Sequence, residues 1–484
     1  MAKQQPTHPK GNPQPRSATP PKREGTLARR LALEAILETD GGRNCFIDEA
    51  LEPRLLRPEL SDEKDHRLLQ EIAYGTLRHR NTLDALLDDY VHFAMKRQRP
   101  AVGWALRLGA YQLVYLGRIP AHAAIDRTIS AFKGIPDMAE RDAGFLNAVL
   151  RRLAGDILRK SESAALDPDD PTVLPIRSGA CHFRRPILPI IRLDPVSHIA
   201  LKHSHPKWLV VRWLARFGAE EAAALCASQN RIPHLAARIT SRAQDREAAI
   251  GSIQAQGVVV APLAGTDSIL LRRTGDPRNL EALAKGWILI QDPTATAIGA
   301  ALAPPPDARV LDLCASPGAK AVQLLEALGP GGSLLACDVD DAKCVRLRQN
   351  LEKAGGNFQV RTVPDEPEAI ELGGTFTHIL LDVPCSNTGV LARRPEARWR
   401  LRWEDLGSLT DLQRKLLAAA VRHLAPGGRL VYATCSIEPE ENQDMAAWAV
   451  REFPGLQLLS EHLFLPHKEP GDGGYCAVMV KSSA

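Results

Sequence analysis

The stretch ARVLDLCASPGAKAVQLLEAL, residues 308–328, decides the fold of the C-terminal part of this 484-residue chain. Its apolar run is typical of a buried strand, and a turn of small residues then leads into a helical pattern. The same strand–turn–helix pattern follows directly in GSLLACDVDDAKCVRLRQNLEKAG, residues 332–355. Strands that alternate with helices of this length predict a parallel, doubly wound α/β sheet.

The remainder of the C-terminal part continues this alternation. An α/β domain is therefore predicted for residues 301–484. Such sheets bind ligands beyond the carboxyl ends of their strands, so the loops that follow the strands are the candidate functional sites. The further strands are expected over residues 357–363, 376–383, 428–436 and 475–481, and the further helices over residues 411–424 and 440–453.

The chain before this domain divides into three regions. Residues 25–155 are helical in pattern, with Leu106, Ala110 and Leu113 on one helix face, and predict an all-helical domain. Residues 204–300 combine helical stretches with short strand-like runs and predict a small α+β module. Residues 156–203 are rich in proline and have no sustained period, which indicates a linker or a partly ordered insertion.

The composition is that of a globular protein, with 44% apolar residues and a formal net charge of +4. Residues 1–24 are basic and predict a disordered tail, either a solvated leader or an arm attracted to polyanions. The nine cysteines form no CxxC pair, which argues against a disulfide framework and against structural zinc. No apolar run is long enough to span a membrane. We therefore expect a cytoplasmic, metal-free monomer with reduced thiols.

The loop CASPGAK, residues 314–320, is a candidate ligand loop because its small residues allow a close approach to the backbone. It is neither a P-loop, since Ala321 follows Lys320, nor a GxGxxG dinucleotide motif. Asp338 ends the next strand about twenty residues further on, a position that suits a ribose diol or a helix N-cap. Asp365 follows the third strand and is either an adenine contact or an exposed loop acid.

Two cysteines follow predicted strands in VPCSNTG and YATCSI, at positions 385 and 435. A structural cysteine usually lies inside a strand, as we expect for Cys314 and Cys337, so cysteines at strand ends favour chemistry. The thiolate is the nucleophilic form, and a free thiol has a pKa of about 8.5. Lys320 could supply the positive charge that favours the thiolate.

A basic segment follows Cys385 and interleaves arginines with tryptophans. Arginine forks hold phosphates and aromatic rings stack on bases, so the segment predicts contact with nucleic acid, with a solvated basic surface as the alternative. Arginines in the helical domain likewise indicate either an RNA-binding or a protein-binding module. The basic segment contains Arg393, Arg394, Arg398, Arg400, Arg402, Trp399 and Trp403, and the helical domain contains Arg78, Arg80, Arg118, Arg151 and Arg152.

In this order, DLCASPGAK, DVPCSNTG and YATCSIEPEEN resemble the cofactor loop, motif IV and motif VI of the RNA cytosine-5 methyltransferase family. SHPKWLVVRW and ILIQDPTATA resemble the module that precedes its catalytic domain. In residues 25–155, AYGTLRHR and AGFLNAVLRR resemble the NusB-like RNA-binding domain of the bacterial small-subunit rRNA branch. The chain departs from the family at Ala319, where glycine is common, and at Thr240, where asparagine is usual.

The resemblance implies a Rossmann-like methyltransferase domain that transfers a methyl group from S-adenosylmethionine to carbon 5 of a cytosine in RNA, foremost 16S rRNA. Cys435 would be the nucleophile that adds to carbon 6, Asp382 would bond the base edge, and Cys385 would assist product release. Lys320 is a further catalytic candidate. The cofactor would contact Cys314, Ala315, Ser316, Pro317, Gly318, Ala319, Lys320, Asp338, Asp365 and Asp382, and RNA would contact Arg393, Arg394, Arg398 and Trp399.

Three alternatives stay open. The substrate could be tRNA or another rRNA cytosine. The two cysteines could exchange roles, because DNA cytosine methyltransferases use a Pro-Cys nucleophile. The chain could also be a NusB-like RNA-binding or assembly factor without catalysis, which Ala319 in the cofactor loop allows and which Asp382, Cys385 and Cys435 argue against.

Overall fold

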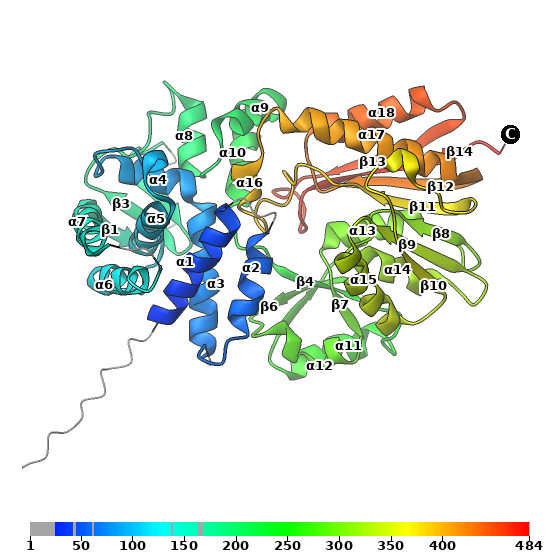
Figure 1. The fold of residues 1–484 in the computed structure, drawn as a ribbon, viewed down its shortest axis with the longest axis horizontal. Helices are drawn as coiled ribbons and strands as arrows, with labels where there is room; N and C mark the ends of the chain where they lie inside the picture. The colour runs from blue at the N-terminus through cyan, green and yellow to red at the C-terminus, as the bar shows by residue number, and fades with distance from the viewer. Residues whose placement is uncertain are drawn as a thin grey trace, which may run out of the picture.

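The computed structural model describes residues 25–41, 45–60, 62–136, 139–162, 167 and 169–483. The predicted basic tail lies outside these residues. Figure 1 shows a helical N-terminal part, a smaller central module and a C-terminal α/β part built on the largest sheet. None of the helices in the described ranges combines the length and apolar character of a membrane span.

The N-terminal part is built around one buried helix, α5 (Pro100–Tyr115), whose residues from Val102 onward are buried. Leu106, Ala110 and Leu113 all lie in the core, as the helical period predicts. The helices that surround it are α1 (Thr26–Asp40), α2 (Ile47–Leu55), α3 (Glu63–Arg78), α4 (Arg80–Asp88), α6 (Ala121–Phe132) and α7 (Glu140–Asp156).

The segment expected to be a linker or partly ordered insertion is folded, and this prediction is wrong for the elements that it contains. Strands β1 (Ile157–Ser161), β2 (Val173–Ile176) and β3 (Gly179–Phe183) form an antiparallel sheet in the order β1-β3-β2, and α8 (Pro195–Lys202) follows. The strands are too short to show a period in the sequence. Their stability comes from packing, because Leu174, Cys181 and Phe183 join the core of the N-terminal helices.

The central module is a four-stranded antiparallel sheet, in the order β5-β6-β4-β7, with helices packed beside it. The mixture of helices and short strands agrees with the α+β character predicted for residues 204–300. Its elements are α9 (Lys207–Phe217), α10 (Ala219–Ser228), β4 (Leu235–Ile239), α11 (Arg246–Ala255), β5 (Val259–Pro262), β6 (Ser268–Arg272), α12 (Glu281–Ala284) and β7 (Ile288–Ile290).

The C-terminal part contains a seven-stranded sheet in the order β10-β9-β8-β11-β12-β14-β13. The strands are β8 (Arg309–Asp312), β9 (Ser333–Asp338), β10 (Phe358–Thr362), β11 (Phe376–Asp382), β12 (Leu424–Thr434), β13 (Leu456–Phe464) and β14 (Gly474–Lys481). The helices are α13 (Pro293–Leu302), α14 (Ala319–Ala327), α15 (Asp341–Ala354), α16 (Ala397–Arg400), α17 (Asp405–His423) and α18 (Gln443–Glu452).

The α/β prediction is confirmed, with one correction: the sheet is mixed rather than wholly parallel. Strands β8 to β12 pair in parallel, whereas β14 pairs antiparallel with β12 and β13 pairs antiparallel with β14. The sequence did not predict β13. Its side chains are largely exposed because it is an edge strand, so the apolar alternation of a half-buried strand is weak there.

Helices cover both faces of this sheet, as Figure 1 shows for α17 and α18 on one side and α14 and α15 on the other. Successive residues of β11 point to opposite faces. Ile379 and Leu381 pack in the cluster with α17 and α18, while Leu380 packs in the cluster with α14 and α15. The strand order reverses between β8 and β11, and doubly wound sheets bind their ligands at the carboxyl ends of the strands at such a point.

Candidate active site

Carboxylates and a cysteine meet at the carboxyl edge of the sheet. Asp312, Asp338 and Asp382 are the last residues of β8, β9 and β11, and Cys435 directly follows β12. These four strands lie side by side, on both sides of the point where the strand order reverses. Ligands of doubly wound sheets bind at this position, so the edge is the candidate active site.

The loop between β8 and α14 is shaped by Gly318, which has a φ of 108°. A Cβ atom at this position would lie 2.8 Å from Cδ1 of Leu347, so both conformation and space favour glycine. Asn350 donates a hydrogen bond to the carbonyl of Pro317 at 2.8 Å and holds the loop against α15. Ala319 is the first residue of α14 and does not have a positive φ, so alanine stands there without backbone strain.

An ion pair joins the first loop to β11. Nζ of Lys320 lies 2.7 Å from Oδ2 of Asp382. Burial is the largest single influence and would lower the pKa of Lys320, but the charge and hydrogen bond of Asp382, together with Asp312 and Cys435, outweigh it, and the pKa of Lys320 is raised. The lysine also interacts with the sulfur of Cys435, so a stable cation lies close to that thiol.

Asp312 is a site residue that the sequence analysis missed. Its side chain is buried, and neither carboxylate oxygen has an aligned hydrogen-bond partner. Burial and then the charge of Asp382 raise the pKa of Asp312 to about 8, which Lys320 and the nearby N–H of Cys314 offset only in part. A carboxylate buried without a partner is costly and rare, which favours a ligand function. The sequence feature that could have identified Asp312 is its position at the end of the apolar run RVLD, residues 309–312.

The two other predicted cofactor acids differ in their surroundings. Asp338 is half-buried, and its carboxylate accepts only a long bond of 3.2 Å from the N–H of Asp340. The N-cap of α15 is Asp340, which accepts from the N–H groups of Ala342 and Lys343, so the alternative N-cap role of Asp338 is excluded. Asp365 is exposed in the loop after β10.

The two strand-end cysteines lie in contact, with 3.1 Å between the sulfurs of Cys385 and Cys435. Cys435 is half-buried, and its thiol also donates to Oδ1 of Asn387 at 3.3 Å. The hydrogen bond with Cys435 and then burial raise the pKa of Cys385 well above its usual value. Cys385 is therefore held as a thiol beside the more accessible sulfur. Of the two predicted core cysteines, Cys337 is buried and Cys314 is half-buried.

The loops that present these cysteines are locked together by buried polar groups. The N–H of Gly389 donates to the carbonyl of Cys435 at 2.9 Å, and a Cβ atom on Gly389 would lie 2.8 Å from that oxygen. Glu441, which is buried, accepts from the N–H of Ser386 at 2.9 Å. The two sulfurs are thus presented from a rigid support.

The arginines predicted to bind RNA lie mainly at the junction between the parts of the chain. Arg393 forms ion pairs with Asp292 and Asp472. Nε1 of Trp399 donates to the carbonyl of Leu77 in α3 at 2.8 Å. Figure 1 shows α16, which contains Arg398 and Trp399, between the helical part and the large sheet.

Arg398 was predicted to contact RNA, and the structure corrects this prediction because its side chain is fully buried. Its guanidinium replaces water with protein oxygens, which explains how a buried charge is tolerated there. From the same stretch, Arg402 and Trp403 are exposed. The acceptors of Arg398 are the carbonyls of Arg78, Ser204, Gln229 and Leu391 and Oδ1 of Asn230.

The arginines of the helical part also divide into two sets. Arg78 is buried and donates to the carbonyl of Ala392 at 2.8 Å, and Arg80 lies over the rings of Trp104 and Trp399. Both therefore belong to the junction with α16. Arg118, Arg151 and Arg152 remain exposed.

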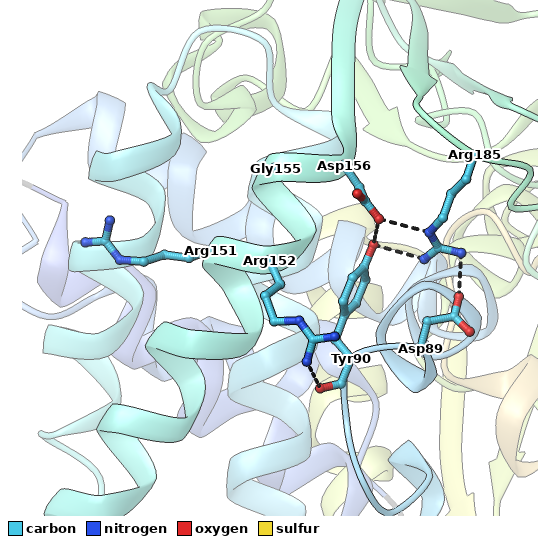
Figure 2. A pocket seen from close by; sticks show the side chains of 7 residues that line it. All are labelled: Asp89, Tyr90, Arg151, Arg152, Gly155, Asp156 and Arg185. Atoms are coloured by element: carbon cyan, nitrogen blue, oxygen red, sulfur yellow. Dashed lines mark hydrogen bonds and ion pairs between the residues drawn. The ribbon is translucent and has the colours of Figure 1, made fainter.

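A separate arginine-lined hollow of about 520 Å³ lies between the C-terminal end of α7 and the segment after β3, as Figure 2 shows. Arg185 is neutralised there by Asp89 at 2.8 Å and Asp156 at 2.9 Å. Arg152 lies over the ring of Tyr90 and donates a long bond of 3.4 Å to its carbonyl, while Arg151 donates to Oδ1 of Asn147 at 2.9 Å. The hollow supplies exposed cationic groups rather than a nucleophile.

No group of three or more histidine, cysteine or acidic side chains suited to a metal ion occurs among the residues that the structure describes. The chemical groups that meet at the carboxyl edge are two thiols, an ion-paired lysine and three carboxylates. They can supply a nucleophile, a cation beside it and acceptors for a cationic or hydroxyl-bearing ligand.

Comparison with family models divides the chain into three matches. Residues 26–155 match the NusB family, residues 205–276 match the RsmF/B-like ferredoxin-like domain, and residues 299–479 match 16S rRNA methyltransferase RsmB/F. Among curated relatives, the chain is 33% identical to ribosomal RNA small subunit methyltransferase B of Sodalis glossinidius, over 90% of this chain and 93% of that protein. It is 32% identical to the protein of the same name from Pseudomonas putida, over 95% and 98% of the two chains.

Two solved structures share the fold. The crystal structure of PH0851 superposes with a TM-score of 0.74 at 22% identity, covering 94% of this chain and 99% of that chain. A methyltransferase homolog from Pyrococcus horikoshii superposes with a TM-score of 0.54 at 24% identity, covering 60% of this chain and 99% of that chain. At this level of identity the superpositions show a common fold.

Proposed function

Because the chain belongs to the 16S rRNA methyltransferase RsmB/F family, we propose that it transfers a methyl group from S-adenosylmethionine to carbon 5 of a cytosine in 16S rRNA. One observation supports this reaction above all others. The sulfurs of Cys385 and Cys435 lie 3.1 Å apart, beside the Lys320–Asp382 ion pair at the carboxyl edge of the sheet. A nucleophile, a second thiol and a charge pair are thus grouped where a ligand of this fold binds.

The residues at the edge fit S-adenosylmethionine. That ligand has a sulfonium and an ammonium cation and a ribose diol, and the buried Asp312 has two carboxylate oxygens without partners. Asp338 is free of the N-cap role and would bond the diol, and Asp365 would lie toward the adenine. The loop of residues 314–320, with Gly318 at its closest point and Asp382 beyond it, would hold the remainder. When bound, the cofactor supplies an electrophilic methyl group.

Cys435 acts first in the proposed reaction. Its thiolate adds to carbon 6 of the cytosine, a carbon–sulfur bond forms, and the electron pair of the ring double bond moves toward carbon 5. The ion pair of Lys320 orients Asp382 toward the base edge. The raised pKa of Cys385 supports the choice of Cys435, because Cys385 stays protonated beside it.

Product release requires the carbon–sulfur bond to break. The proton on carbon 5 passes to solvent, its electron pair restores the ring double bond, and Cys435 leaves as a thiolate. The Cys385 thiol, 3.1 Å away, donates a hydrogen bond to the departing sulfur and stabilises its charge.

The proposal is tested by exchanging each cysteine for alanine and incubating the protein with labelled methyl donor and 16S rRNA. Cys435→Ala should abolish turnover and form no covalent RNA adduct on a denaturing gel. Cys385→Ala should accumulate the adduct. An active Cys435→Ala protein together with an inactive, adduct-free Cys385→Ala protein would exchange the two roles.

One measurement identifies the RNA substrate, and a second tests the alternative that the protein is a non-catalytic assembly factor. Bisulfite sequencing of a deletion strain should reveal a 16S cytosine that loses its mark, whereas a lost tRNA mark would change the substrate. Calorimetry with S-adenosylmethionine should show binding, and its absence would favour the assembly factor.

We propose different roles for the predicted RNA-binding residues according to their burial. Arg398 and Trp399 hold the helical part on the catalytic part through the contacts at α16, and Arg393 holds the start of α13 to the loop before β14 through Asp292 and Asp472. Arg151 and Arg152, at the hollow in Figure 2, remain available for phosphates of the RNA.

A further inference from the structure

We infer that Asn387 and Arg394 are positioning residues for the Cys435 thiol, and that the helical N-terminal part contributes to this positioning through Phe46. The inference rests on the proposed function, in which Cys435 is the nucleophile. It concerns a chain of contacts that runs from α2 to the sulfur.

Asn387 is the residue in direct contact with the nucleophile. Its Oδ1 accepts from the thiol of Cys435 at 3.3 Å, and its Nδ2 donates to the carbonyl of Cys385 at 2.8 Å. One amide thus contacts both cysteine loops. Its backbone has a φ of 61°, a left-handed conformation that asparagine tolerates better than most residues. The amide therefore fixes the direction in which the thiol hydrogen of Cys435 points.

Arg394 fixes the orientation of that amide. Its Nη1 donates to Oδ1 of Asn387 at 3.2 Å. If the amide were turned over, its NH₂ group would face both the guanidinium and the thiol hydrogen, and both bonds would be lost. Asn387 also stands between the positive charge of Arg394 and the sulfur of Cys435, because its Oδ1 accepts from both side chains.

The same guanidinium contacts the helical part of the chain. The Arg394 guanidinium carbon lies 4.2 Å from the ring centroid of Phe46, which precedes α2, and that of Arg400 lies 5.5 Å from the same centroid. At these distances a guanidinium over an aromatic face is attracted to it. Phe46 is therefore a support for the side chain that orients Asn387.

The start of α2 is itself held by the catalytic part. The N–H of Ile47, the first residue of α2, donates to Oε1 of Glu396 at 2.9 Å, so a carboxylate from one part caps a helix of the other. Arg400 donates to the carbonyls of Thr39 and Cys45 at 2.7 and 2.6 Å. A shift of α2 would consequently move Phe46 and Arg394 together. The helical part is thus connected to the nucleophile through three side chains.

The test compares Arg394→Ala, Arg394→Lys and Phe46→Leu with the control Arg402→Ala. Arg402 lies in the same basic segment, but 75% of its side chain is exposed and it forms its ion pair with the neighbouring Asp405. Two quantities are measured: the rate of Cys435 alkylation by iodoacetamide, followed by peptide mass spectrometry, and kcat and KM on 16S rRNA.

For Arg394→Ala we expect slower alkylation of Cys435 and a kcat about 3- to 10-fold lower, the loss typical of one hydrogen bond, with little change in KM. Arg394→Lys should retain part of the wild-type alkylation rate and part of the wild-type kcat. Phe46→Leu keeps the apolar volume and should act in the same direction, and the double variant should show less than the sum of the two effects. Arg402→Ala should match the wild type.

Unchanged alkylation and kcat in Arg394→Ala would overturn the positioning role, and so would an equal loss in Arg402→Ala. Additive effects of Phe46→Leu and Arg394→Ala would remove the helical part from the chain of contacts. Should Arg394→Ala fail to fold, Phe46→Leu and Arg394→Lys decide the outcome. Alkylation needs neither RNA nor cofactor. A wild-type protein inactive on RNA, with alkylation that still depends on Arg394, would therefore reject only the proposed function.

Discussion

The junction at α16 and the carboxyl edge of the sheet each bury an ionisable side chain, but in opposite surroundings. Arg398 donates to five oxygens from three parts of the chain. Asp312 is equally buried and has no aligned partner for either oxygen. A buried group that bonds oxygens from several segments holds structure together, whereas one whose oxygens have no partner costs stability and favours a ligand.

The largest effect is expected at the junction. Arg398→Ala would leave five oxygens without their donor and create a cavity, so the free energy of unfolding should fall by roughly 3 kcal/mol or more. Urea denaturation followed by circular dichroism measures this. Arg402→Ala, in which an exposed arginine of the same stretch is removed, should change the free energy of unfolding by less than about 0.5 kcal/mol. Equal losses of unfolding free energy in Arg398→Ala and Arg402→Ala would contradict the expected difference between a buried and an exposed arginine.

At the carboxyl edge of the sheet, removing the buried ionisable group should raise the free energy of unfolding instead of lowering it. Asp312→Asn keeps the shape and removes the unpartnered charge, so the variant should be more stable than the wild type by up to about 5 kcal/mol at pH 8, which corresponds to the rise in the pKa of Asp312 from 3.8 to about 8. The same variant should lose affinity for S-adenosylmethionine in calorimetry, because the carboxylate that we propose to face the ligand cation is gone. A destabilised variant with intact affinity would make Asp312 a structural residue.

The pH dependence sharpens this comparison. The folded-state pKa of Asp312 is raised to about 8 from an ordinary value of 3.8, so the folded protein binds the proton more tightly than the unfolded chain. The contribution of Asp312 to stability should therefore fall as the pH rises from about 4 to about 8, and should be constant above that. The difference between Asp312→Asn and wild type, measured by urea denaturation across this window, should grow with pH. A constant difference contradicts the assignment.

The smallest effect is expected for exposed charges. Replacing Arg151 and Arg152 by alanine should leave stability unchanged and weaken 16S rRNA binding by roughly 3- to 10-fold at low salt, with a shallower dependence on salt concentration. Filter-binding titrations at several salt concentrations measure both. Replacement of Lys343, an exposed lysine on α15, serves as the control for loss of surface charge. Identical salt dependence in the double variant and wild type would exclude the hollow from RNA binding.

Much of the C-terminal fold could be predicted because its strands and helices have strong periods. Strands β8 to β11 and helices α14, α15 and α18 begin and end close to the predicted positions, whereas α17 and β12 begin at Asp405 and Leu424, several residues before the predicted 411 and 428. The loops with Lys320, Asp382, Cys385 and Cys435 could be located for the same reason, since each follows such a strand. By contrast, β1 to β3 and β13 were missed, because short strands and exposed edge strands have weak patterns.

The sequence by itself determined the order of strands and helices and the loops that present chemical groups, because hydrophobic periodicity and small-residue turns act over a few neighbouring residues. Only the tertiary structure decided which charges are buried and what they contact. Arg398 and Arg402 are four residues apart in one basic stretch, yet one is enclosed by oxygens from distant segments and the other faces solvent. Burial depends on segments far away in the chain, and no local pattern contains that information.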